Sequence, residues 1–285
     1  MNNNVNKHTK RQLVQDFTKI KFIFFMALAV GIVWIAIFAD AIVPYDPYAQ
    51  NLSEALQAPS SSHILGTDRY GRDMLSRVIM GARISVFSTL ALVLLISVFG
   101  TIIGIFCGYN GGKMDSIIMR ISDVFLAFPG IVFAIAVAGV MGGGMINAVI
   151  ALAVTSWPKY ARIARGQVLI IKEMPYIAAS KLSGSTTTKI LFKHIMPNIA
   201  GPILVTAMLD IGTMMMELAG LSFLGLGVQP PAAEWGSMMS NGRSMIQTSP
   251  WVVLGPGFAI FMTVAIFNLL GDTIRDLLDP RRNQV

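Results

Sequence analysis

Long uncharged runs of apolar residues alternate with short polar stretches over most of the chain. A hydrocarbon core of about 30 Å needs roughly 20 apolar residues in each spanning helix. The runs therefore predict an all-α polytopic membrane protein with six transmembrane helices and both chain ends on one side. The predicted spans lie at about 22–39, 84–108, 117–142, 146 to beyond 157, 199–222 and 251–273.

The first two runs carry additional local signals. The first follows a cluster of basic residues and also resembles a secretory signal peptide, with Ala-Asp-Ala at 39–41 where a cleavage site would lie. Its apolar part is longer than the roughly 7–15 residues of a signal peptide, so we interpret it as a retained span. In the second run, Gly100, Gly104 and Gly108 recur every four residues, a spacing that lets membrane helices pack closely.

The uncharged stretch 124–158 is too long for one helix and too short for two helices with a turn. The three glycines at 142–144 are expected to divide it, because glycine favours turns. The third span must therefore begin upstream, near Ile117, and include Asp123. The fourth must run from Ile146 past Trp157.

Composition and charge agree with a protein solvated by lipid. The chain is 54% hydrophobic and 13% charged, whereas a soluble domain carries about 25% charged residues. Its net charge of +7 does not indicate nucleic acid, because the basic residues cluster at the ends of apolar runs. Most of them fall in the parts predicted to be cytoplasmic, which favours cytoplasmic N- and C-termini. The exceptions lie outside, at Arg69, Arg72, Arg77, Arg83 and Arg243.

The first extracytoplasmic loop, about 44–82, contains the sequence HILGTDRYGRDMLSR. Asp68, Arg69, Arg72 and Asp73 alternate in sign within it. We interpret them as a structural clamp in which acids and arginines neutralise each other, which would explain arginines on the outer side. A direct contact with a substrate is the alternative.

Three acidic residues lie in or near predicted spans, at Asp123, Asp210 and Glu217. An ionisable residue within the membrane is a candidate functional residue. Asp123 has a simpler interpretation, an ion pair with Arg120 three residues before it. Asp210 and Glu217 are seven residues apart and share one helix face, which would line a polar translocation path or meet a partner subunit.

The sequence predicts no catalytic residue, no cofactor and no metal site. GYNGGKM at 108–114 lacks the spacing and the final hydroxyl of a phosphate-binding loop, and Ser222 is not in a G-x-S-x-G elbow. The Met pairs and triplets are interpreted as adaptable packing rather than as ligands. Cys107 allows no internal disulfide, and the three His residues lie in different regions.

The polar, basic stretch 173–198 lies between the fourth and fifth predicted spans, on the cytoplasmic side. It predicts a short helix from Met174 to Leu182, with Pro175 in its first turn. Gly184 would end this helix, and the hydroxyls that follow would cap a second one that Pro197 stops. A helix pair this short needs a surface to dock against, and a chain without an ATP site would use it to receive force from a separate ATPase.

Gly184, with Ile195 eleven and Pro197 thirteen residues later, resembles the EAA coupling loop of bacterial ATP-binding-cassette (ABC) importer permeases. Five further motifs resemble the second permease of the peptide/nickel branch: LGTDRYGRD, AFPG, LSFLGLG, EWG and FNLLGDTIRDLLDP. The chain departs from the family where the loop often has Glu-Ala-Ala, since Ala178-Ala179-Ser180 stand there. The resemblance assigns ATPase coupling to Tyr176, Ala178, Ala179, Ser180, Gly184, Ile195 and Pro197.

The resemblance also implies an architecture and partners. Residues 1–83 would form a cytoplasmic tail, the first span and an extracytoplasmic loop, residues 84–274 the type-1 transmembrane domain, and residues 275–285 a cytoplasmic tail. In the bacterial cell membrane, the chain would form a heterodimer with a second homologous permease. Two ATP-binding subunits and an extracytoplasmic substrate-binding protein would complete the importer.

The cargo stays open between nickel and short peptides. KLSGS at 181–185 and LDIGTMM at 209–215 favour the nickel permeases over the dipeptide permeases. Histidine is scarce, so nickel would travel as a chelate rather than on dedicated side chains. Two competing classes are an ion-coupled secondary transporter that uses the buried acids and a membrane scaffold that transports nothing. The first would leave the polar stretch 173–198 without a purpose, and the second would not need acids within the spans.

Overall fold

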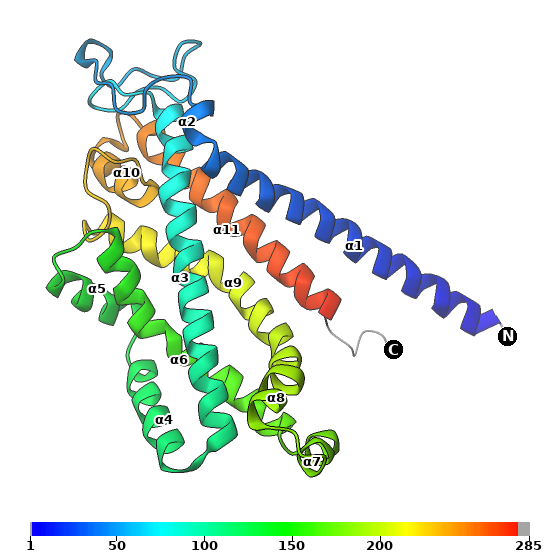
Figure 1. Ribbon diagram of the computed structural model, residues 1–285. Helices are drawn as coiled ribbons and strands as arrows, with labels where there is room; N and C mark the ends of the chain where they lie inside the picture. Colours follow the sequence, from blue (N-terminus) through cyan, green and yellow to red (C-terminus); the bar gives the residue numbers. More distant parts are fainter. Residues whose placement is uncertain (1, 279–285) are drawn as a thin grey trace.

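The computed structural model describes residues 2–278, and within them the protein is helical, with no β-strand (Figure 1). Short 3-10 turns at Leu52–Glu54 and Arg243–Met245 and a π-turn at Leu191–Ile195 supplement the α-helices. The α-helices are α1 (Asn2–Ile37), α2 (Ala39–Ile42), α3 (Met74–Asn110), α4 (Gly112–Ala127), α5 (Gly130–Val140), α6 (Met145–Ile171), α7 (Pro175–Leu182), α8 (Thr187–Ile190), α9 (Met196–Phe223), α10 (Trp235–Gly242) and α11 (Trp251–Leu278).

Four helical segments of the described chain are long and apolar enough to cross a membrane, namely Phe17–Ile37, Met74–Asn110, Thr187–Phe223 and Trp251–Leu278. The pair α4 and α5 would supply a fifth span if the two are taken together. The helix α6 has the length of a span, but Lys159, Arg162 and Arg165 lie in its second half. The all-helical membrane fold is confirmed, and the count of six spans stays a prediction.

The third predicted span is not one straight helix. Its two halves, α4 and α5, meet at an angle of 94°. Phe128 precedes a proline and adopts an extended conformation (φ −101°, ψ 149°), as steric contact with the proline ring favours. Pro129 then caps α5. The apolar pattern continues across this break, so it did not reveal the bend.

The helices α3 and α6 form the central seam of the fold, and the predicted glycine face of α3 is confirmed as their contact. A Cβ added to Gly100 would lie 2.5 Å from the carbonyl oxygen of Trp157, and one added to Gly104 would lie 2.3 Å from that of Ala161. These distances leave no room for a methyl group. The two helix backbones therefore touch, as small residues permit in membranes.

The loop between α2 and α3 folds over one end of the bundle together with α10, and α7 lies at the opposite end (Figure 1). The indole nitrogen of Trp251 donates to the carbonyl of Thr67 (3.0 Å), and that of Trp235 donates to the carbonyl of Val78 (2.8 Å). Because α3 already starts at Met74, after its cap Asp73, the predicted boundary at 83/84 falls inside this helix. The predicted tail 275–285 overlaps α11, and residues 279–285 lie outside the described residues.

Candidate functional site

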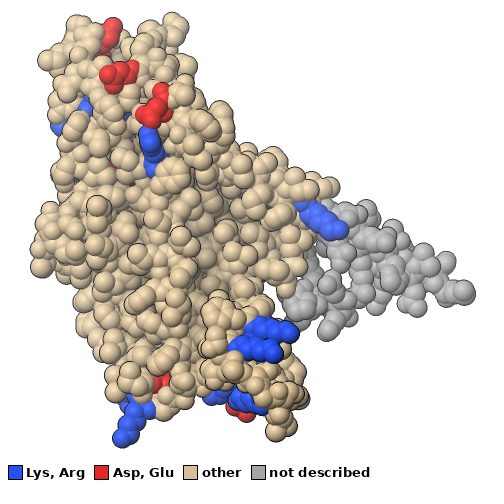
Figure 2. Space-filling model, viewed as in Figure 1, with Lys and Arg blue, Asp and Glu red and all other residues tan. Residues whose placement is uncertain are grey.

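Charged side chains gather at the two ends of the molecule and leave its middle almost free of charge (Figure 2). On the face shown, acidic groups lie near the folded loop between α2 and α3, and lysines and arginines gather at the end that carries α4 and α7. The predicted site residues fall into three regions: this loop, the charged positions of α4, α6 and α9, and the segment around α7.

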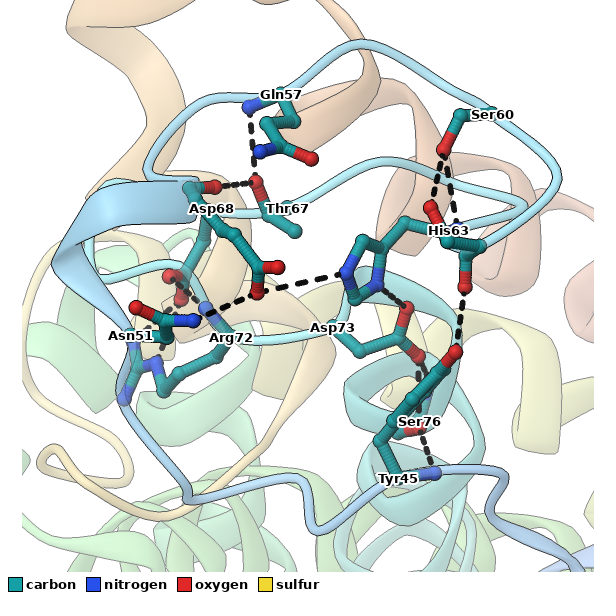
Figure 3. A network of polar contacts seen from close by, with 12 residues as sticks. Tyr45, Asn51, Gln57, Ser60, His63, Thr67, Asp68, Arg72, Asp73 and Ser76 are labelled. Carbon is teal, nitrogen blue, oxygen red and sulfur yellow. Dashed lines mark hydrogen bonds and ion pairs between the residues drawn. The ribbon is translucent and has the colours of Figure 1, made fainter.

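In the loop, Asp68 and Arg72 form a buried ion pair (Figure 3). One carboxylate oxygen of Asp68 accepts from the backbone N–H groups of Tyr70 (2.8 Å) and Arg72 (3.1 Å). The other accepts from the guanidinium of Arg72 at 2.6 and 2.7 Å, and the guanidinium of Arg77 lies 3.7 Å away. Burial of such a pair is tolerated only when its remaining donors and acceptors are also satisfied. Asp68 therefore fixes the turn that carries it.

Asp73 acts on a different group of residues, at the start of α3. Its carboxylate accepts from the backbone N–H and the hydroxyl of Ser76, both at 2.7 Å, and contacts the ring nitrogen Nδ1 of His63 at 2.9 Å (Figure 3). This is an N-cap, and an Asp directly before the first residue of an apolar helix is its sequence signal. His63 and Ser76 were missed in the sequence. Arg69 is exposed and lies over the ring of Tyr70.

Glu234 anchors α10 against α3 and was also missed. Its carboxylate accepts from the backbone N–H groups of Gly236 (2.9 Å) and Ser237 (2.8 Å) and from the hydroxyl of Ser85 on α3 (3.3 Å). Burial raises the pKa of Glu234, and these hydrogen bonds oppose the rise. The neighbouring Trp235 fits against Gly81, where a Cβ would lie 2.8 Å from its ring. The EWG motif therefore packs α10 onto α3.

Asp210 is buried on α9 and bonded to two residues of α6. The ammonium of Lys159 donates to one carboxylate oxygen at 2.6 Å, and the hydroxyl of Tyr160 donates to the other at 2.9 Å. Lys159 itself keeps 49% of its side chain exposed. Glu217, two helical turns further along α9, is half-buried and makes no hydrogen bond or ion pair within the described residues.

Two further ion pairs join α6 to α4. Asp123 pairs with Arg162, so the expected pair with Arg120 is wrong. The reason is that α4 lies beside α6, whose arginine reaches it from across the helix pair. In the more buried of the two pairs, Arg165 holds both oxygens of Asp115 at 2.6 Å, a bidentate contact. One sequence signal pointed to such pairs, because basic residues inside an apolar helix require partners.

The segment around α7 is held by an apolar cluster. Ile177, Ile190 and Ile195 are 0–1% exposed and pack with Val168 and Ile171 at the end of α6. The predicted start of α7 at Pro175 agrees with the structure, and Thr186 caps α8 by accepting from the N–H of Lys189. The helix pair is therefore docked on the bundle through one face.

The other face of this segment is open. Ala178 and Ala179 are exposed, as is Gly184, whose φ of +77° ends α7 in a conformation that favours glycine. Tyr176 is 44% exposed, with its ring 6.0 Å from that of His194. The hydroxyl of Ser180 lies 3.5 Å from Nε2 of the same histidine. These residues are available to a partner.

One expectation for this segment is wrong, because Pro197 does not stop the helix. The chain continues from α8 through the π-turn into α9, as one helical run from Thr187 to Phe223. Pro197 lies in the first turn of α9, and the π-turn directly before it changes the hydrogen-bond register, so the missing N–H is accommodated there. The second short helix is therefore continuous with a span.

An apolar cavity of about 620 Å³ opens between α9, α10 and α11. Asn268 is the polar residue among side chains that are otherwise apolar, such as Met216, Phe223 and Phe261. Within the described residues, no group of three or more His, Cys, Asp or Glu side chains is placed to hold a metal ion. Asp210 and Glu217 do not line this cavity, so the cavity and the acidic positions of α9 are separate features.

Comparisons with known proteins relate the chain to permeases. Its residues 100–284 match the family described as "Binding-protein-dependent transport system inner membrane component". A glutathione transport system permease protein, GsiD of Pectobacterium atrosepticum, is 46% identical over 250 residues, covering 87% of this chain and 82% of that protein. A dipeptide permease, DppC of Alkalihalophilus pseudofirmus, is 42% identical (90% and 84% covered). A nickel permease, NikC of Escherichia coli K12, is also 42% identical (84% and 86% covered).

The fold has a solved counterpart. A chain of the methionine ABC transporter MetNI, in an inward-facing conformation, superimposes with a TM-score of 0.54 and 20% identity. The match covers 72% of this chain and 98% of that one, and it supports the fold alone. From the family match and these relatives, the chain belongs to the inner-membrane components of binding-protein-dependent transport systems, in the peptide/nickel branch of ABC importer permeases.

Proposed function

We propose that the protein is one of two non-identical permease subunits of an ATP-driven importer in the bacterial cell membrane. Two ATP-binding subunits would dock on its cytoplasmic side, and an extracytoplasmic binding protein would deliver cargo to the side of the folded loop. Both chain termini would be cytoplasmic. ATP hydrolysis would take place on the separate subunits.

The observation that carries this proposal is that the segment of α7 and α8 is packed on one face and exposed on the other. One face is fixed to α6 and α9 by fully buried isoleucines, while the other face exposes small residues. A short helix that is rigidly held on one side and open on the other suits the transfer of a displacement from a partner. Because Gly184 and Ala179 leave space above the backbone, a groove of the ATPase would approach closely.

The cargo we propose is a small molecule, either a short peptide or a nickel chelate. Relatives of similar identity are named for glutathione, dipeptide and nickel transport. The loop residues Asp68, Arg72 and Asp73 would then serve structure, as a rigid cover for the outer end. Asp123, Asp210 and Glu217 would line the path or the subunit interface.

The test is transport by the complete importer in proteoliposomes, with both permeases, the ATPases and the binding protein. We expect uptake of a labelled dipeptide or a nickel chelate that requires ATP and the binding protein, and that disappears when this chain is omitted. Uptake that follows a proton gradient and ignores ATP would instead support an ion-coupled transporter. Cells deleted for the gene, grown on limiting nickel or on dipeptides, separate the two cargos.

A further inference from the structure

The polar residues in the membrane part of α9 lie on one face. Between Ile199 and Leu221 they are spaced four, three and four residues apart, at Thr206, Asp210, Thr213 and Glu217. In a helix this spacing places them in one narrow sector. Thr213 is exposed and Glu217 is half-buried, so the sector is open to the surroundings at these two positions.

The two acidic residues of this polar face differ in whether they have a cationic partner. Asp210 is neutralised by the ammonium of Lys159 at 2.6 Å and also accepts from Tyr160. Glu217 has no ion pair within the described residues, and Lys159 is engaged by Asp210. Glu217 is therefore the acidic residue of this face that lacks a cationic partner among the described residues.

In its ionised form, Glu217 needs a partner within a membrane, because an unpaired charge there is costly. That partner must come from water, from a neighbouring subunit or from cargo. Thr213 on the same face is exposed, and Lys159, which pairs with Asp210 of this face, keeps about half of its side chain exposed. This favours a hydrated path over a dry interface.

We propose that Glu217 is the site on the translocation path that receives a primary ammonium group of the cargo, such as the amino terminus of a short peptide. This inference rests on the proposed importer function and assigns its substrate chemistry. An ammonium donates short, charge-assisted hydrogen bonds to a carboxylate. Because Glu217 holds no such donor among the described residues, it would bind the passing cation without first breaking an ion pair there.

The experiment uses the complete importer in proteoliposomes and measures uptake of a dipeptide per ATP hydrolysed. We expect Glu217→Gln to reduce uptake about tenfold, the value of one charge-assisted hydrogen bond, with ATP hydrolysis and assembly unchanged. Glu217→Asp should stay within about twofold of the wild type. Met216→Leu, an exposed residue of α9 outside this polar face, is the matched control and should transport normally.

A second measurement separates charge from shape. In Glu217→Cys, combined with Cys107→Ser, a sulfonate-bearing thiol reagent restores a negative charge and an ammonium-bearing reagent of similar size adds a positive one. Recovery of uptake with the first and not with the second supports the assignment. Equal effects of the two reagents, normal uptake by Glu217→Gln, or a wild-type importer that moves nickel chelates and no dipeptide would each overturn it. A wild-type complex without any ATP-driven uptake would instead refute the proposed function.

Discussion

Replacing Ile177 by Ala should detach α7, the proposed coupling helix, without unfolding the protein. The helix α7 has eight residues, and isolated helices shorter than about 12–15 residues are marginal in water. Its position therefore depends on tertiary contacts. Ile177 is the buried residue of α7, with 0% exposure, and it packs with Ile190, Ile195 and Val168.

The size of the effect follows from this burial. Truncation of a buried Ile to Ala costs about 2–5 kcal/mol when the cavity cannot collapse. A cost of about 2 kcal/mol shifts the docking equilibrium of α7 by roughly 30-fold, since 1.4 kcal/mol corresponds to tenfold. The spans are packed elsewhere, around the α3–α6 seam, so the loss should stay local.

Hydrogen exchange in the purified importer measures the docking directly. Amides of α7 should lose protection in Ile177→Ala, while those of α3 and α6 keep theirs, and ATP hydrolysis should continue with little uptake. Leu182→Ala removes a similar side chain from the same helix, but Leu182 is 91% exposed. It should leave exchange of α7 unchanged.

Two results would refute this reasoning. If α7 keeps its protection in Ile177→Ala, the apolar cluster is not what holds it. If α7 is deprotected and uptake per ATP stays at the wild-type value, α7 does not transmit force.

Two further predictions concern sidedness and the open face of α7. Cysteines placed at Ser61 and Ser185 should react oppositely with an impermeant thiol reagent in intact cells, the first labelled and the second protected; equal labelling would contradict the topology. Ala179→Trp should clash with a docked partner, at a cost of about 1–3 kcal/mol, and Gly184→Val should strain a φ of +77°. Both should lower co-purification of the ATPase, measured against Thr187→Ala as a near-neutral control, and wild-type levels in both would exclude this contact.

Helix positions were largely predictable because they depend on local pattern. The apolar runs predicted α1, α3, α9 and α11, and Pro175 predicted the start of α7. The same local reasoning was wrong at Pro197, because the helix continues past a residue that usually ends helices. Pro197 lies in a first turn, where proline is tolerated, and a π-turn before it absorbs the change in hydrogen bonding.

Contacts between helices were less predictable, because they depend on how the spans pack. The sequence offers Arg120 on the same helix as a partner for Asp123, and nothing in it indicates that Arg162 lies nearer. The cluster of His63, Asp73 and Ser76 likewise requires the loop to fold back on the start of α3. Spacing shows which residues share a face, and only packing decides what that face meets.

The position of α6 explains how these separate features act together in the proposed importer. Its end packs on α7 through Val168, and its length packs on α3 through contacts too close to admit a methyl group. We expect helices packed this tightly to move as one body, so in the proposed importer a displacement of α7 would carry α6 and α3 with it. The apolar cluster also joins α7 to the start of α9. Further along, the links from α6 to α4 and α9 include polar pairs with Asp115, Asp123 and Asp210. Ion pairs can exchange partners or water without creating a cavity, whereas a packed seam cannot. We therefore expect the two conformations that transport requires to differ at these pairs, where α4 and the later part of α9 meet α6.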